Sequence, residues 1–225
     1  MGRAIRLGRD PERERGTVAE MADIGGGIAD GAGIAEEDRM RADLYGLLGW
    51  LLKAPPDAAG LARIAAMRGD DSALGRAIAA LAKAARGIAP ERVDDEYHVL
   101  FVGLGRGELM PYGSYYLTGF LHEKPLAKLR LDMARLGIAR AEGNSEPEDN
   151  IAALCEMMAG LILGRFGAPA DLAGQRQFFD RHIGPWAGRF FADLEEVEAA
   201  AFYMPVGRIG ALFIDIEAQA FEMAA

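Results

Sequence analysis

The spacing of apolar side chains is the feature that most constrains what this chain can fold into. Along most of its length, apolar residues recur every three or four positions, which is the period of a helix with one buried face. No stretch alternates apolar and polar residues in a run rich in β-branched types, and alanine is abundant while valine is scarce. We therefore predict an all-α fold, a single-domain helical bundle of roughly eight to ten helices.

Prolines, glycines and small polar residues predict where several helices begin and end. Pro90 and Pro125 stand where a first-turn proline belongs, and Gly137 follows the last apolar residue of its stripe. Asp71 or Ser72 is suited to cap the helix that comes after it. These positions divide the chain between residues 36 and 137 into successive helices.

The most apolar helix is predicted to open near residue 146. Ser145 and Glu148 have the spacing of a capping box, with Pro147 inside the first turn. Three further helices are expected around residues 171–183, 185–201 and 205–223. The residues that we place on apolar helical stripes include Met40, Leu172 and Ile216.

The length of 225 residues allows one sizeable core and is short for two ordinary domains. Residues 1–35 differ from the rest, because arginines are interleaved with acids and the glycine-rich stretch 25–33 has little to bury. We predict a disordered arm over residues 1–35, and an inert extension is favoured over an arm that contacts an acidic partner or a membrane. Residues 36–225 are expected to form the helical domain, with a polar hinge at 139–146.

The charge and cysteine content narrow the classes of partner and compartment. A formal net charge of −9 argues against a general nucleic-acid binder, which needs a basic face, and suits a partner that carries positive charge. The single cysteine, Cys155, excludes an internal disulfide framework. No uninterrupted apolar run approaches the length of a membrane span, and the N-terminus lacks the apolar core of a secretory signal. We expect a soluble cytoplasmic protein without an integral membrane segment.

The segment 96–121 is the strongest candidate for a functional site. It carries glycines at 103, 105 and 107 and then an aromatic cluster, Tyr112, Tyr115, Tyr116 and Phe120. A groove lined by aromatic and aliphatic side chains is typical of sites that capture extended apolar peptides. Arginines on such a peptide would need carboxylates, and the candidates are Glu96, Glu108, Glu146, Glu148 and Asp149. The alternative for each aromatic ring is a place in the core between helices.

Residues for catalysis or metal binding are not arranged in a known pattern. The histidines His98, His122 and His182 are far apart and match no metal-ligand spacing, so core or surface roles are favoured. Cys155 is predicted to lie on the apolar face of a helix, where a thiol is inert. Ser114 lacks the surroundings of a nucleophilic serine. We expect no metal and no enzymatic activity.

The glycine loop from Gly103 to Gly107 resembles a phosphate-binding loop only in its glycines. A nucleotide fingerprint follows a strand and opens a helix, whereas this loop follows a predicted helix and runs into Met110 and Pro111. A lysine followed by serine or threonine is also missing. We therefore do not infer a nucleotide site, although GTP stays open as a weak alternative ligand.

Two ordered motifs carry a resemblance to a known family. The first is Glu96-Tyr97-x-x-Leu100-Phe101, then the glycines, then Pro111-x-x-Ser114-x-Tyr116-Leu117. The second is Glu146-Pro147-Glu148-Asp149-Asn150, followed by the apolar helix with Glu156-Met157-Met158, and the aromatic residues between 178 and 191 match as well. Over residues 36–222 the chain resembles the TorD/DmsD family of cytoplasmic redox-enzyme maturation chaperones, within the NarJ-like superfamily.

The resemblance implies an all-α fold and a chaperone rather than an enzyme. It implies binding of the twin-arginine (Tat) signal peptide of a molybdoenzyme precursor, such as a formate dehydrogenase or a dimethyl sulfoxide or trimethylamine N-oxide reductase. The precursor would be held for molybdenum-cofactor insertion and kept from premature Tat export. Carried over by motif, the implied peptide-binding residues are Tyr97, Leu100, Phe101, Pro111, Tyr112, Ser114, Tyr116, Glu146, Asp149 and Asn150.

One position departs from the family pattern. Asn150 stands where the family usually has histidine, and an asparagine forms hydrogen bonds but takes no charge near neutral pH. The family includes monomers and domain-exchanged homodimers, and both stay open here. The rival hypothesis is a GTP-binding helical switch or a small helical enzyme that uses the loop Gly103–Gly107.

Overall fold

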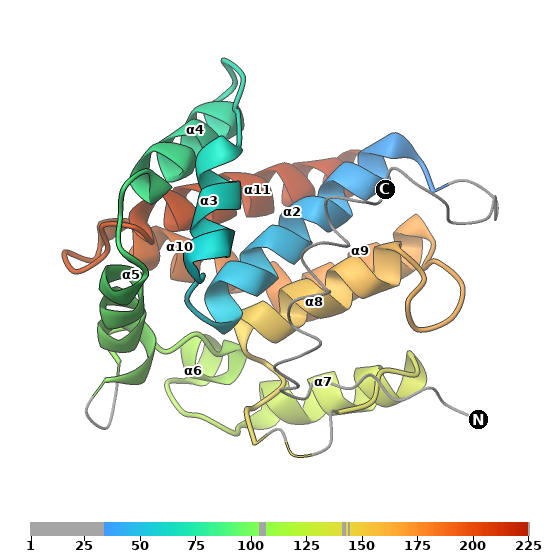
Figure 1. Cartoon of the computed structure of the whole chain (residues 1–225). Coiled ribbons are helices and arrows are strands. Elements are labelled where there is room, and N and C mark those ends of the chain that lie inside the picture. The colour runs from blue at the N-terminus through green and yellow to red at the C-terminus, as the bar shows by residue number, and fades with distance from the viewer. Residues whose placement is uncertain (1–33, 104–106, 141–142, 144, 225) are drawn as a thin grey trace.

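The computed structural model describes residues 34–103, 107–140, 143 and 145–224, which form ten α-helices and two π-helical turns (Figure 1). The elements in chain order are α2 (Glu36–Lys53), α3 (Ala58–Ala66), α4 (Ala73–Ala85), α5 (Pro90–Tyr97), η1 (His98–Val102), α6 (Gly113–Thr118), α7 (Lys124–Arg135), α8 (Ile151–Ile162), α9 (Leu172–Phe178), η2 (Phe179–Ile183), α10 (Ala187–Glu196) and α11 (Met204–Met223). The predicted all-α class and the approximate number of helices are confirmed. Residues 1–33 of the predicted arm, and residues 141, 142 and 144 of the predicted hinge, lie outside the described residues.

Helix α8 is the centre of the core. Ten of its twelve residues are buried, which agrees with the prediction that residues 151–162 form the most apolar helix. Helix α2 packs along α8, and α11 packs against α10 behind them (Figure 1). Cys155 lies fully buried on α8, and burial raises the pKa of its thiol.

A buried group of polar side chains joins α2, α9 and α11. Glu217 is 1% exposed, and its carboxylate accepts hydrogen bonds from Arg41 Nε at 2.7 Å and from Arg41 Nη2 at 2.9 Å. The Tyr45 hydroxyl donates to the same carboxylate over 3.0 Å, and Arg41 Nη1 donates to Gln175 Oε1 over 2.8 Å. Because each charged group has partners, the cost of burying the carboxylate is offset.

The helix ends that were predicted from local signals are found in the structure. Ser72 caps α4 by accepting a hydrogen bond from Gly75 N over 2.9 Å, and Pro90 lies in the first turn of α5. Pro125 lies in the first turn of α7. Gly137 follows α7 with a φ of +71°. Local chemistry therefore determines these boundaries.

Some boundaries and stripe residues were predicted wrongly. Met40, Leu172 and Ile216 are 54%, 47% and 47% exposed, because each lies on a side of its helix where no other element packs. The helix expected over 185–201 covers only Ala187–Glu196. The helix expected over 171–183 changes from α to π after Phe178.

The elements that bear the predicted site residues lie along one side of the bundle. Helices α5 and α6 and the turn η1 lie beside the ends of α8 and α10, and α7 runs along the edge of the molecule below α8 (Figure 1). Within the described residues, no helix combines the length and the apolar character needed to cross a lipid bilayer.

The buried pair of Arg41 and Glu217 gives a stability prediction. Arg41→Met leaves the Glu217 carboxylate buried without its guanidinium, so the free energy of unfolding should fall by about 3 kcal/mol in urea denaturation. Adding Glu217→Gln removes the unpaired charge and should recover most of that loss. The control is Arg39→Met, an exposed arginine on the same helix, which should change stability by less than about 0.5 kcal/mol. Equal losses for Arg39→Met and Arg41→Met would contradict this account.

Candidate functional site

The structure joins the two sequence motifs directly. The N–H of Gly113 donates to the carbonyl of Asp149 over 2.9 Å. The N–H of Ile151 donates to the carbonyl of Pro111 over the same distance. Together they form a single antiparallel bridge between segments that are almost forty residues apart in the sequence. We call this contact the motif junction.

At the motif junction, helices α6 and α8 begin side by side, and one side chain caps each of them. Asp149 Oδ2 accepts a hydrogen bond from the backbone N–H of Ser114 in the first turn of α6, over 2.6 Å. Asn150 Oδ1 accepts from the N–H of Ala152 at the start of α8, over 2.8 Å. The capping box expected at Ser145 is therefore wrong, because Asn150 is the cap and α8 begins at Ile151.

Asp149 and Ser114 are buried but incompletely hydrogen-bonded. Asp149 is 3% exposed and Ser114 is 0% exposed. Among the described residues, the second carboxylate oxygen of Asp149 (Oδ1) and the Ser114 hydroxyl have no hydrogen-bond partner. Buried polar atoms without partners are uncommon, because desolvation without a hydrogen bond is costly. These two atoms are the least satisfied polar groups near the junction.

Three polar side chains meet at the outer edge of the junction. Glu146 is exposed, and its Oε1 accepts hydrogen bonds from the Tyr112 hydroxyl and, over 3.2 Å, from Asn150 Nδ2. Burial of the phenol and the adjacent carboxylate raise the pKa of Tyr112. Asn150 thus uses its oxygen for the helix cap and its nitrogen for Glu146. The substitution of the family's histidine by asparagine preserves one donor and one acceptor.

Tyr116 connects α6 to α10. Its ring centroid lies 5.4 Å from that of Trp186 and 5.9 Å from that of Phe190. Its hydroxyl donates to Asp193 Oδ2 over 2.7 Å, and the Arg189 guanidinium lies 5.7 Å from the ring centroid. Burial and the Asp193 carboxylate raise the pKa of Tyr116. The ring is therefore part of the packing between helices and only partly available to a ligand.

The three predicted residues on α5 and η1 form a separate group. Leu100 is fully buried, while Tyr97 and Phe101 are half-buried. Their rings lie 5.1 Å apart, and Phe101 packs edge-on against Tyr203 at 5.5 Å. The Tyr97 hydroxyl donates to the carbonyl of Lys53 over 3.0 Å. This group fixes α5 against the ends of α2 and α11.

Two carboxylates that were candidates for arginine binding have internal partners. Glu148 is 7% exposed, and it forms ion pairs with Arg130 at 2.8 Å and with Arg140 at 3.4 Å. Glu96 accepts hydrogen bonds from the backbone N–H groups of Phe202 and Tyr203, just before α11. Both carboxylates therefore stabilise the fold.

Three residues near the junction are not among the implied peptide-binding residues: Leu117, Phe120 and Trp186. Leu117 and Phe120 are 43% and 69% exposed, one and four residues after Tyr116. Trp186 lines a small pocket at the junction whose lining residues are Gly113, Leu117, Pro125, Leu129, Asp149, Leu154, Arg181, His182 and Trp186. The run of apolar residues up to Phe120 was a signal for the first two, whereas the position of Trp186 depends on tertiary packing.

Comparison with known proteins identifies the family. The family described as nitrate reductase delta subunit matches residues 68–192, more than half of the chain. The chain belongs to this family. Among curated relatives, the chaperone protein TorD of Vibrio atlanticus is 24% identical over 128 residues, which are 53% of this chain and 60% of TorD. TorD of Vibrio cholerae is 28% identical over 122 residues, 51% of this chain and 56% of TorD. The match thus spans less than two thirds of these relatives.

A solved structure shares the fold. A protein of Archaeoglobus fulgidus described as a redox enzyme maturation protein superposes with a TM-score of 0.53 and 20% sequence identity, covering 84% of this chain and 99% of that protein. The kinship with TorD that the two motifs predicted is confirmed, and so is the helical fold of this family member.

The glycines in this family member have a structural role at Gly107. A Cβ atom there would lie 2.6 Å from the carbonyl oxygen of Leu100, where the chain folds back onto η1. Gly103 has a φ of +60° at the end of η1, and residues 104–106 of the loop lie outside the described residues. Among the residues that the structure describes, no group of three or more histidine, cysteine or acidic side chains could hold a metal ion.

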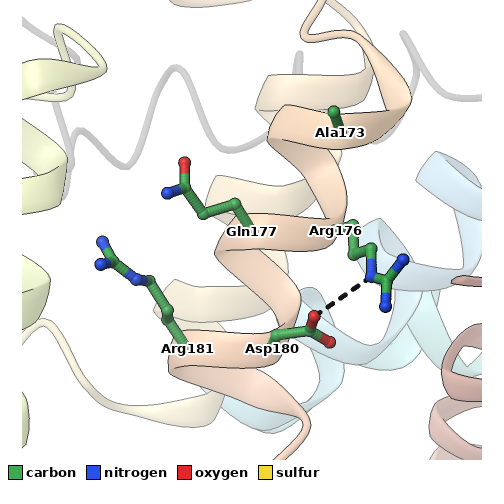
Figure 2. Close-up of a pocket in the computed structure, with 5 residues that line it drawn as sticks. All are labelled: Ala173, Arg176, Gln177, Asp180 and Arg181. Atoms are coloured by element: carbon green, nitrogen blue, oxygen red, sulfur yellow. Dashed lines mark hydrogen bonds and ion pairs between the residues drawn. The ribbon is translucent and has the colours of Figure 1, made fainter. Parts of the chain in front are cut away.

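An open hollow of about 380 Å³ lies on α9 and η2, away from the motif junction (Figure 2). Its lining residues are Ala173, Arg176, Gln177, Asp180 and Arg181. Arg176 pairs with Asp180 at 3.3 Å, and Gln177 and Arg181 point to the other side (Figure 2). Of these residues only Arg181 also lines the junction pocket. The hollow therefore brings none of the predicted peptide-binding residues together.

The capping role of Asp149 gives a prediction for stability. Asp149→Ala removes the acceptor for the first turn of α6, so the free energy of unfolding should fall by about 1–2 kcal/mol. Chemical denaturation measures this, with Asp180→Ala as the exposed control. A loss below about 0.5 kcal/mol would show that the cap contributes little to stability.

Proposed function

We propose that this chain is a chaperone and not an enzyme, and that it binds the twin-arginine signal peptide of a molybdoenzyme precursor. It would hold the precursor in the cytoplasm for cofactor insertion and prevent its premature export through the Tat pathway. Membership of the family and the relatives named TorD chaperones support this proposal. The observation that carries it is the motif junction, where both motifs of the resemblance meet in one surface with apolar and acidic side chains.

The apolar part of the proposed site is the outer face of α6. Leu117 is exposed there and Phe120 is exposed just beyond the end of α6, while Tyr112 and Tyr116 are each partly exposed. An apolar segment of a signal peptide laid over this face would remove these side chains from water, which favours binding by about 25 cal/mol for each Å² of apolar surface. The buried residues Pro111, Ser114 and Leu100 would hold this surface in position.

The acidic part of the proposed site is at the junction itself. Glu146 is exposed at the edge, and Asp149 Oδ1 lies beneath it without a partner among the described residues. Guanidinium groups form strong charge-assisted hydrogen bonds with carboxylates. The arginines of the peptide would therefore meet Glu146 first and Asp149 where access allows. No cofactor of the chaperone itself is needed for this binding.

Isothermal titration calorimetry of the full chain with a synthetic twin-arginine leader tests the proposed function. The leader should come from a molybdoenzyme encoded beside this protein, and a leader with both arginines changed to glutamine is the matched control. We expect saturable binding that weakens with added salt and is weaker for the control peptide. No binding of any twin-arginine molybdoenzyme leader from the same genome would overturn the proposal, and binding of GTP instead would favour the nucleotide switch.

Phe120 gives a prediction for the apolar face. Phe120→Ala should weaken leader binding about five- to tenfold, because the exposed ring is removed without disturbing a buried contact. Ile216→Ala, an exposed apolar residue on α11, is the matched control and should leave the affinity unchanged. Equal affinities of Phe120→Ala and the unaltered chain would exclude the outer face of α6 from the binding surface.

A further inference from the structure

Helix α7 covers the pocket at the motif junction. Pro125 and Leu129 of α7 line one side of this pocket, and Trp186 and Asp149 line the other. The space left free is about 10 Å³, close to the room that one water molecule needs. A side chain of a ligand cannot enter while α7 is in this position.

One lining residue of the covered pocket, Asp149, has a buried oxygen without a hydrogen-bond partner among the described residues. The hydroxyl of Ser114, which also has no partner, does not line the pocket but lies in the first turn of α6 beside it. In a site that is closed permanently, such atoms are usually paired or replaced by apolar groups. The unpaired oxygen of Asp149 is explained if the pocket opens and a hydrogen-bond donor enters.

Apolar and charged contacts hold α7 in place, and its buried apolar side chains are Leu126, Leu129 and Met133. Asp132, on α7, lies 2.9 Å from Arg181 Nη1 and 2.9 Å from His182 Nε2, both on η2. Arg130, also on α7, pairs with Glu148 at 2.8 Å just before α8. The arginines of both pairs are about half exposed, whereas the side chains of Asp132 and Glu148 are 14% and 7% exposed. These pairs therefore contribute to the cost of separating α7 from its neighbours.

The connection between α6 and α7 contains two residues in the left-handed region of backbone conformation. Gly119 ends α6 with a φ of +83°. His122 has a φ of +61° although it is not glycine, and it is exposed. A non-glycine residue in the left-handed region is strained, and rotation at such positions is a common way for a helix to move as a unit.

We propose that α7 is a movable cover, and that this chain binds its peptide in a state in which α7 has separated from η2 and exposed Trp186 and the second oxygen of Asp149. This inference rests on the proposed function, because the peptide is the ligand that enters. The contacts of Asp132 with Arg181 and His182 then oppose peptide binding. The fraction of open molecules sets the apparent affinity, since only that fraction accepts the peptide.

The variant Asp132→Cys with Arg181→Cys tests the cover in both directions. Without a cross-linker this protein lacks the ion pairs of Asp132 with Arg181 and His182, so the leader should bind at least threefold more tightly than it binds the unaltered chain. A short, reducible bis-methanethiosulfonate then ties α7 to η2, and affinity should fall at least tenfold and return on reduction. Cys155 is buried and does not compete for the reagent.

Two controls separate the cover from simpler effects. Asp180→Asn changes the charge by the same amount as Asp132→Asn, but Asp180 pairs with Arg176 and not with α7. We expect tighter leader binding for Asp132→Asn only. If the cross-linked protein binds the leader as tightly as the reduced one, the cover is overturned while the proposed function stands.

Hydrogen exchange tests the cover without any peptide. The amides of residues 124–135 should exchange faster in Asp132→Asn than in Asp180→Asn, while those of residues 151–162 in α8 are unchanged. If no leader binds to any variant, the proposed function fails. The exchange rates of residues 124–135 then still show whether α7 is a movable cover. Equal protection of residues 124–135 in both variants would overturn it.

Discussion

The arrangement of this part of the molecule depends on one constraint: α6 and α8 start side by side. The first N–H groups of α6 and α8 have no partners within their own helices, so they must be satisfied from outside. Asp149 and Asn150, neighbours in the chain, supply one acceptor to each helix. The backbone pair between the two motifs is what brings the helix starts close enough for this. The aromatic residues of α6 owe their position beside Trp186 to the same contact.

Three glutamates use their negative charge inside the fold. Glu217, Glu148 and Glu96 each accept hydrogen bonds from groups of the chain itself. Around α7, arginines and lysines are interleaved with the acids. A net charge of −9 therefore does not describe the electrostatics at the motif junction. Under the proposed function, recognition of a basic peptide there would depend on individual carboxylates, chiefly Glu146 and Asp149, rather than on the field of the whole protein.

The parts of the fold that the sequence predicted well are those determined by neighbouring residues. Ser72, Pro90 and Pro125 act within one helical turn, so their roles can be read locally. The exposure of Ile216 and Leu172 was mispredicted, because it depends on which sides of α11 and α9 other elements cover.

In the candidate site too, local features could be predicted and tertiary contacts could not. The two motifs are segments that the structure brings into contact, and the aromatic run covers α6 and its two ends. The sequence shows that residue 149 is a carboxylate but not that one oxygen caps a helix while the other is buried without a partner among the described residues. Ser145 and Glu148 offered a capping signal of correct spacing, yet Asn150 is the cap because the pairing with Pro111 determines where α8 begins.

The single buried cysteine has a practical consequence. Cys155 lies at the centre of α8, fully enclosed, and burial disfavours its thiolate. A thiol reagent in solution can react only with molecules in which α8 has separated from its neighbours. The rate at which a thiol reagent labels Cys155 in the native chain therefore measures how often the core opens. Because the sequence has one cysteine, all of the label reports on this position. Cys155 is thus a built-in probe for the opening of the core.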